Sequence, residues 1–225
     1  MAPQGEPETS ATYASLILGL TMLSRVFPVI RLFDAPNTLT AANAALGVLA
    51  MCLSRDGHVE LGAALIVLAA LLDYLDGHLA RTYFGDQIEH RAFGKQLDTL
   101  ADLLNFSVAP AVIISETFTD TPFNRPICVA LILSSVLRLA LFNVLPERKK
   151  PGYIGIPTTY TGFILANALF LQASQHLSEG AVLSVVALFA VLQVLSIPVR
   201  KIPAKTVIPL MVAIFAMAVV YAKFS

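Results

Sequence analysis

Residues 66–81 read IVLAALLDYLDGHLAR, an apolar run that ends in two acids, a glycine and an arginine. The apolar part is typical of a helix inside a lipid bilayer, where a charged side chain is costly. On a helix, offsets of three and of seven or eight residues return to the same face, so Asp73, Asp76 and Arg81 project to one side. The stretch therefore predicts a membrane helix with a polar, functional end.

The rest of the chain repeats this apolar pattern. Of its 225 residues, 56% are hydrophobic and 13% are charged, whereas soluble domains carry roughly 25% charged residues. The mean hydropathy is +0.74. The net charge of zero argues against a nucleic-acid partner. We predict an all-α integral membrane protein, a polytopic bundle of about seven or eight spans surrounded by membrane lipids. The stretches predicted to span are 37–54, 60–80, 98–117, 126–145, 155–174, 181–198 and 206–223.

The N-terminal region differs from the rest. Residues 1–12 are polar and contain proline, so we predict a disordered tail. Residues 13–225 are predicted to form a single membrane-embedded catalytic domain. Within it, residues 13–33 are apolar but contain Arg25 and Arg31. This segment either lies in the membrane interface as an amphipathic helix, which we favour, or forms an eighth span.

The basic residues predict the orientation, because cytoplasmic loops of membrane proteins are enriched in Lys and Arg. With seven spans, one side of the membrane receives Arg55, Arg125 and Lys223. The side that receives the polar end of the 60–80 span also receives Arg25, Arg31, Arg81, Arg91, Lys95, Arg148, Lys149, Lys150, Arg200, Lys201 and Lys205. We therefore predict that this polar end lies at the cytoplasmic face of the cell membrane.

A second acidic pair follows in GKQLDTLADLLNFSVAPAV, residues 94–112. Asp98 and Asp102 are four residues apart and share a helix face. Two antiparallel helices joined on the cytoplasmic side would bring them to Asp73 and Asp76. Four carboxylates in a low-dielectric site need compensation by hard cations, for which Mg²⁺ or Mn²⁺ is suited. Two such ions are a known solution for displacement at phosphorus.

The residues between and after the first acids support this chemistry. Gly77 lets another group approach the helix backbone, Ala80 keeps the same face open, and Arg81 is suited to a phosphate oxygen. One acid or arginine near a helix end is often only a structural ion pair. The whole array at this spacing instead favours a metal-bound pyrophosphate at the membrane surface.

Asp73-x2-Asp76-Gly77-x2-Ala80-Arg81, followed by Gly94-x3-Asp98-x3-Asp102, resembles the signature of the CDP-alcohol phosphatidyltransferases. The spacer between Arg81 and Gly94 is longer than is usual in that family. The resemblance implies a six-helix catalytic core with additional helices, usually as a homodimer, that displaces CMP from a CDP-linked lipid by an acceptor hydroxyl. It further implies that the four aspartates hold two metal ions, that Asp102 is also the general base, and that the nucleotide-lipid is contacted by Gly77, Ala80, Arg81 and Gly94.

The segment PNTLT, residues 36–40, resembles the entry of the first span in that family, whose residues lie near the cytidine. Asn37 and Thr40 are the candidates for this contact. An equally good explanation is that Asn37 or Thr38 caps the helix.

Three further runs are similar to bacterial and archaeal phosphatidylserine synthases: ADLLNFSVAPA (101–111), LRLALFNV (137–144) and YIGIPTTYTG (153–162). They favour L-serine as the acceptor and CDP-diacylglycerol as the donor. Arg138 is a cation inside a span and needs a negative partner, either an acceptor carboxylate, the lipid phosphate or a motif aspartate. Asn105 and Asn143 are candidates for orienting the acceptor or for satisfying helix backbones. Leu141 replaces an arginine of those synthases, and glycerol phosphate, inositol phosphate and choline remain alternative acceptors.

A metal-ion transporter is the alternative from another class, since acids inside a membrane also mark ion paths. Such a path predicts carboxylates throughout the bilayer. Residues 127–146 and 180–225 contain no Asp or Glu. The clustered acids all fall at one face, which favours the transferase.

Overall fold

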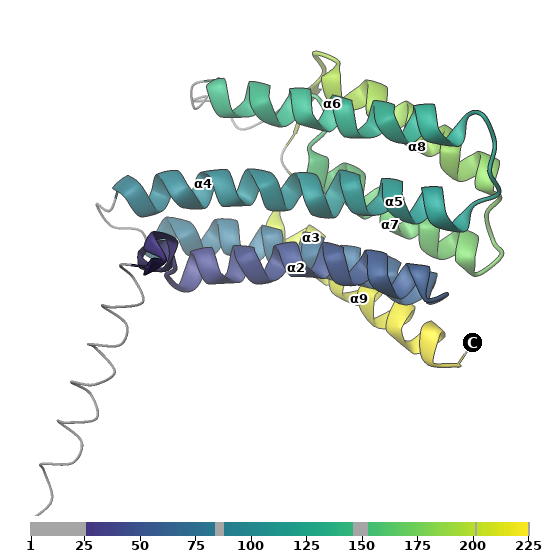
Figure 1. The fold of residues 1–225 in the computed structure, drawn as a ribbon, viewed down its shortest axis with the longest axis horizontal. Helices are drawn as coiled ribbons and strands as arrows, with labels where there is room; N and C mark the ends of the chain where they lie inside the picture. The colour runs from purple at the N-terminus through teal and green to yellow at the C-terminus, as the bar shows by residue number, and fades with distance from the viewer. Residues whose placement is uncertain (1–25, 84–87, 146–152, 201, 225) are drawn as a thin grey trace, which may run out of the picture.

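The computed structural model describes residues 26–83, 88–145, 153–200 and 202–224, without the side chains of 76–83, 204, 205, 207 and 222–224. Helices dominate this part of the chain and run along its long axis (Figure 1). They are η1 (Pro28–Leu32), α2 (Ala35–Arg55), α3 (Val59–Tyr83), α4 (Ile88–Leu103), η2 (Leu104–Val108), α5 (Ala109–Thr117), α6 (Asn124–Val144), α7 (Thr158–Ala173), α8 (Glu179–Val194) and α9 (Ala204–Phe224). The predicted all-α class is confirmed, apart from the short antiparallel pair of β1 (Tyr153–Ile154) and β2 (Pro198–Val199).

The helices form a layered bundle (Figure 1). α2 packs along α3, and α6 packs along α8. The continuous rod of α4, η2 and α5 lies between these two pairs, and α7 contacts both α3 and α8. α9 leans against α3 at the edge of the bundle. This arrangement surrounds the rod with α2, α3, α6 and α7, so the rod is central to the fold.

Three helical segments of the described residues are long and apolar enough to cross a membrane: Ala35–Arg55, Ile88–Thr117 and Asn124–Val144. The total number of spans and the six-helix core stay predictions. The stretch 98–117 predicted to span lies within a longer helical segment that begins at Ile88. Its first ten residues mix charged and apolar side chains, so they extend the helix without being apolar enough to be recognised as a span. Residues 1–25 lie outside the described residues, so the predicted tail and most of the segment 13–33 cannot be compared with the structure.

The start of α2 is fixed by a capping residue that differs from the expectation. Asp34 is the N-cap, and its carboxylate accepts a hydrogen bond of 3.0 Å from the backbone N–H of Asn37. Pro36 lies in the first turn, where a missing N–H is harmless. The expectation that Asn37 or Thr38 caps the helix is therefore wrong, because the helix begins at Ala35 and both residues lie inside its first turn.

The central rod contains a π turn, η2. The N–H of Ala109 donates to the carbonyl of Leu104, five residues earlier. Pro110 follows at the start of α5 and has no N–H to continue the regular ladder. The π turn thus lies where the regular ladder would need this N–H.

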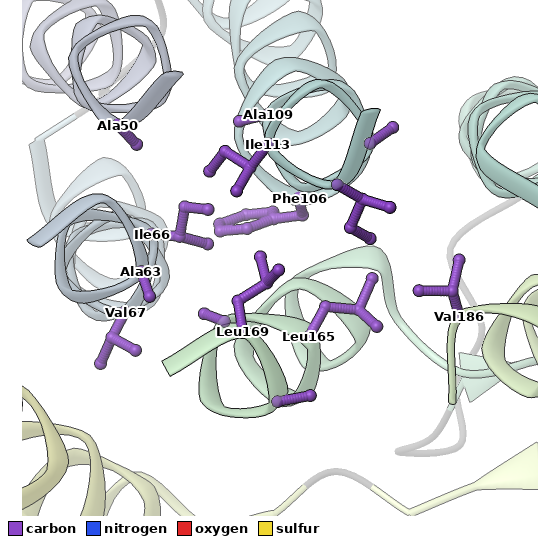
Figure 2. Close-up of a cluster of buried hydrophobic side chains, with 14 of the residues drawn as sticks. Ala50, Ala63, Ile66, Val67, Phe106, Ala109, Ile113, Leu165, Leu169 and Val186 are labelled. Atoms are coloured by element: carbon purple, nitrogen blue, oxygen red, sulfur yellow. The ribbon is translucent and has the colours of Figure 1, made fainter. Parts of the chain in front are cut away.

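The hydrophobic core forms around this π turn. In Figure 2 the ring of Phe106 lies between Ile66 of α3 and Ile113 of α5, with Leu165 and Leu169 of α7 beside it. These side chains are fully buried. A Cβ on Gly162 would collide with the Phe106 ring, so glycine allows α7 to pack closely on η2. The core thereby holds α3 and α7 against η2 and α5, which continue directly from α4.

Candidate active site

Three of the predicted carboxylates come together beside the start of α7. Asp73 comes from α3, and Asp98 and Asp102 come from α4. Each offers a carboxylate oxygen, and these oxygens all lie within 4.8 Å of one another. The four-residue spacing puts both acids of α4 on one helix face, and Asp73 of α3 reaches them from a second helix.

The remaining residues of the first motif lie outside the described side chains. Asp76, Gly77, Ala80 and Arg81 belong to α3, but only their backbone is described. Their parts in holding metal and nucleotide stay predictions.

A cavity of about 180 Å³ opens beside the carboxylates. It is bounded by α3, α4, α6, β1 and α7. Its polar wall includes the three aspartates, and Leu139 and Phe142 of α6 contribute apolar surface. Its other lining residues are Tyr74, Lys95, Thr99, Arg138, Asn143, Tyr153, Pro157, Thr158, Thr159 and Tyr160. A cavity with one charged wall and one apolar wall suits a substrate that is part phosphate and part lipid.

Two adjacent hydroxyls at the start of α7 contact the carboxylates. The Thr159 hydroxyl donates to Asp73 Oδ2 at 3.0 Å, and the Thr158 hydroxyl donates to Asp102 Oδ2 at 3.5 Å. The sequence analysis did not select either threonine. Their only signal is the Thr-Thr pair after Pro157 at the expected start of a span.

Arg138 enters the same cavity from α6. It is 7% exposed, and its Nη1 lies 3.5 Å from the Thr158 hydroxyl. Its Nε has no hydrogen-bond partner among the described residues, and no described carboxylate forms an ion pair with it. Arg138 lines the cavity, and a buried guanidinium there is suited to a bound anion.

Tyr153 on β1 adds a neutral polar group to the lining. Burial raises the pKa of its phenol above the ordinary value, and the neighbouring Tyr160 and Asp73 raise this pKa further. Tyr153 therefore stays protonated at neutral pH and is able to donate a hydrogen bond.

The two candidate acceptor asparagines have different surroundings. Asn143 lines the cavity, and its amide donates to the Thr99 hydroxyl at 3.0 Å. Asn105 is fully buried in η2 and is absent from the cavity lining; its amide donates to the carbonyl of Asn43 on α2 at 3.1 Å. The structure thus brings Asn143 to the cavity with Arg138, and it joins Asn105 to a helix backbone.

The candidates near the cytidine lie at the start of α2, away from the lining of this cavity. Asn37 is buried, and its amide donates to the carbonyl of Leu32 at 2.7 Å and to that of His90 at 3.5 Å. Its side-chain oxygen fills the space where a Cβ on Gly94 would lie. The Thr40 hydroxyl donates to Pro36 within α2. Asn37 thus connects η1, α2 and α4. Through it, the PNTLT segment contacts the second part of the aspartate motif at Gly94.

The donor set fits a hard divalent cation. Mg²⁺ and Mn²⁺ prefer oxygen ligands, and Asp73, Asp98 and Asp102 supply carboxylate oxygens within reach of one ion. Two cations, Lys95 and Arg138, line the same cavity as the three carboxylates.

Comparison with known proteins agrees with this geometry. A model of the CDP-alcohol phosphatidyltransferase family matches residues 33–223. The chain therefore belongs to the CDP-alcohol phosphatidyltransferase family, a family of phosphotransferases that in general depend on divalent metal ions. Together with the long apolar helices, family membership makes it an integral membrane protein.

The similar proteins carry two related names. The chain is 31% identical over 157 residues to archaetidylserine synthase from Methanothermobacter thermautotrophicus, a match that covers 69% of this chain and 66% of the relative. It is 30% identical over 213 residues to CDP-diacylglycerol–serine O-phosphatidyltransferase from Mycobacterium leprae, covering 84% and 68%. It is 28% identical over 197 residues to the protein of that name from Methanocaldococcus jannaschii, covering 87% and 88%. The matched region is thus just under two thirds of the first relative's length.

Proposed function

We propose that the chain transfers the phosphatidyl group of CDP-diacylglycerol to the hydroxyl of L-serine, giving phosphatidylserine and CMP. The observation that carries this proposal is the cavity in which three converging carboxylates face a buried arginine. The names of the relatives support serine as the acceptor. In the reaction, a bond forms between the serine oxygen and the lipid-linked phosphorus, and the bond from that phosphorus to CMP breaks.

In this proposal the aspartates have two roles, metal binding and proton transfer. Asp73, Asp76, Asp98 and Asp102 hold two divalent ions, Mg²⁺ or Mn²⁺. Bound there, such ions neutralise charge on the diphosphate and on the leaving CMP. Asp102 takes the proton of the attacking serine hydroxyl as general base. Its support from Thr158 and its place in the cavity lining favour this role.

The nucleotide-lipid is held by the first motif and its neighbours. Gly77, Ala80, Arg81 and Gly94 contact the CDP moiety, and Asn37 and Thr40 lie near the cytidine. The support for these roles is the motif, together with the contact between Asn37 and Gly94. The apolar residues Leu139 and Phe142 of the cavity wall face the lipid part of the donor.

Serine is recognised by its charged groups. Arg138 pairs with the serine carboxylate, and Asn143 orients the acceptor beside it. The free Nε of Arg138 and the position of both residues in the cavity support this assignment. Asn105 supports the helix around the site through its bond to Asn43.

We further propose that the site opens at the cytoplasmic face of the cell membrane and that the enzyme is a homodimer. The distribution of Lys and Arg in the sequence supports the orientation. A single cysteine placed in the 84–87 connection of a cysteine-free variant would react with an impermeant reagent only from the cytoplasmic side. Labelling from the outside of intact cells would contradict the orientation.

The acceptor is tested by offering purified protein CDP-diacylglycerol with serine, glycerol phosphate, inositol phosphate or choline separately, and by following CMP release. We expect release with serine and a divalent ion, and none after chelation. CMP release with glycerol phosphate alone would support phosphatidyl transfer but would show that serine is not the acceptor. Ion flux in proteoliposomes without CMP release would favour a transporter and overturn the proposal.

A further inference from the structure

The start of α7 places two hydroxyls against acids that come from two other helices. Thr159 donates to Asp73 of α3 at 3.0 Å, and Thr158 donates to Asp102 of α4 at 3.5 Å. The partners are 86 and 56 residues apart in the sequence. One turn of α7 therefore contacts both helices that supply the carboxylate cluster.

The backbone that leads to these hydroxyls is hydrogen-bonded to the end of α8 and to the residues that follow it. The N–H of Gly155 donates to Ile197 at 2.9 Å, and the N–H of Ile156 donates to Leu192 at 3.2 Å. Gly155 has a φ of 70°, and a Cβ there would collide with the carbonyl of Gln193. These contacts hold the segment that leads into α7 in place against α8. They therefore also fix the positions of Thr158 and Thr159.

We propose that Thr158 and Thr159 are positioning residues that orient Asp102 and Asp73 for binding a divalent ion. The inference rests on the proposed metal site and names residues that the family signature does not contain. A carboxylate has about four lone-pair sites, so one hydroxyl donor leaves the others for metal and fixes which way they point. When a residue that hydrogen-bonds to a metal ligand is replaced, the metal affinity or the activity typically falls by about 10–100-fold.

Thr158 has a second contact that Thr159 lacks. It is 1% exposed, accepts from Arg138 Nη1 and donates to Asp102 Oδ2, both at 3.5 Å. The hydroxyl thus stands between a cation and an anion that would otherwise be free to pair directly. With Thr158 in place, Asp102 keeps its oxygens for metal and proton transfer, and Arg138 keeps a donor for the acceptor.

The matched control is Thr161, on the same helix and fully buried. Its hydroxyl donates to the carbonyl of Pro157 at 3.3 Å and contacts no carboxylate among the described side chains. Thr→Val at this position removes a buried hydroxyl from the same turn of α7 without touching the acids. A change common to all three positions would therefore report damage to α7, and a change at positions 158 and 159 alone would report carboxylate orientation.

The experiment measures Mn²⁺ affinity by electron paramagnetic resonance on purified full-length protein in detergent, together with CMP release at increasing Mn²⁺. We expect Thr159→Val and Thr158→Val to weaken Mn²⁺ binding about 10–100-fold, Thr159→Ser to restore it, and Thr161→Val to leave it unchanged. Thr159→Ala replaces the valine variant if that variant does not fold.

Two results would overturn the inference: wild-type Mn²⁺ affinity in the valine or alanine variants, or an equal loss in Thr161→Val. Failure of the proposed function gives a different pattern, because the wild-type protein itself would then bind no Mn²⁺ or release no CMP with any acceptor.

Discussion

Arg138 of α6 and Asp102 of α4 share one hydroxyl, that of Thr158, which lies 3.5 Å from Arg138 Nη1 and 3.5 Å from Asp102 Oδ2. No direct ion pair joins the two among the described residues. A buried cation and a buried anion that meet through a hydroxyl both keep free hydrogen-bonding capacity. Each is therefore available for a separate part in the reaction.

The first prediction concerns Asp102 as general base. Asp102→Asn keeps the shape of the side chain and removes its ability to take a proton, so turnover should fall by about 10²–10⁴-fold. Binding of CDP-diacylglycerol should persist, and a direct binding assay with CDP-diacylglycerol checks this. Asp120→Asn, at an exposed pair with Arg125, is the control and should leave turnover unchanged. If the Asp102→Asn variant made phosphatidylserine at the wild-type rate, Asp102 would not be the general base.

The second prediction concerns Arg138 as the partner of the serine carboxylate. A hydrogen bond to a charged group contributes about 1.5–3 kcal/mol, so Arg138→Gln should raise the KM for serine about ten- to a hundredfold. The KM for CDP-diacylglycerol should change little. Arg125→Gln is the control, because Arg125 is exposed and pairs only with Asp120 among the described residues. A rise in the KM for the nucleotide-lipid alone would place Arg138 on the lipid phosphate instead.

The third prediction concerns metal and stability. A ligand that binds only the folded state at about 100 times its Kd adds about 2.7 kcal/mol to the free energy of unfolding. Mn²⁺ should therefore raise the melting temperature of the protein in detergent, and chelation should reverse the rise. Asp73→Asn should abolish this shift, because it removes one ligand of the cluster. An unchanged shift in Asp73→Asn would locate the ion elsewhere.

The fourth prediction concerns the packing of α7 on the π turn. Gly162→Ala adds a Cβ that would collide with the Phe106 ring, and overpacking a core typically costs about 1–3 kcal/mol. We expect lower stability in thermal unfolding, together with weaker metal binding because α7 carries Thr158 and Thr159. Gly180→Ala is the matched control, since a Cβ there meets nothing within 4 Å. Equal effects of the two substitutions would contradict the close packing.

The comparison of sequence and structure is clearest at α4. The spacing of Asp98 and Asp102 predicts one helix face, and the structure places both there, towards Asp73. Asn105 follows Asp102 by three residues, and regular helix geometry would carry it to the same face. Asn105 instead lies within the π turn, and its amide donates to the carbonyl of Asn43 on α2. Helical periodicity cannot anticipate a local change of that periodicity.

The threonines of α7 show the other limit. Threonine at the start of an apolar helix is ordinary in sequence, and a hydroxyl carries no charge that would mark it as costly in a membrane. The partners of Thr158 and Thr159 are 56 and 86 residues away. Only the folded chain brings these hydroxyls to the acids.

The amino-acid sequence by itself determined the helical membrane class and the chemistry at one end of the bundle, because apolar length and the spacing of charges are local properties. The tertiary structure decided which helices surround the carboxylates, which polar groups orient them and which asparagine faces the cavity. Those choices depend on how α3, α4, α6 and α7 pack, and packing is set by contacts between residues that are distant in the chain.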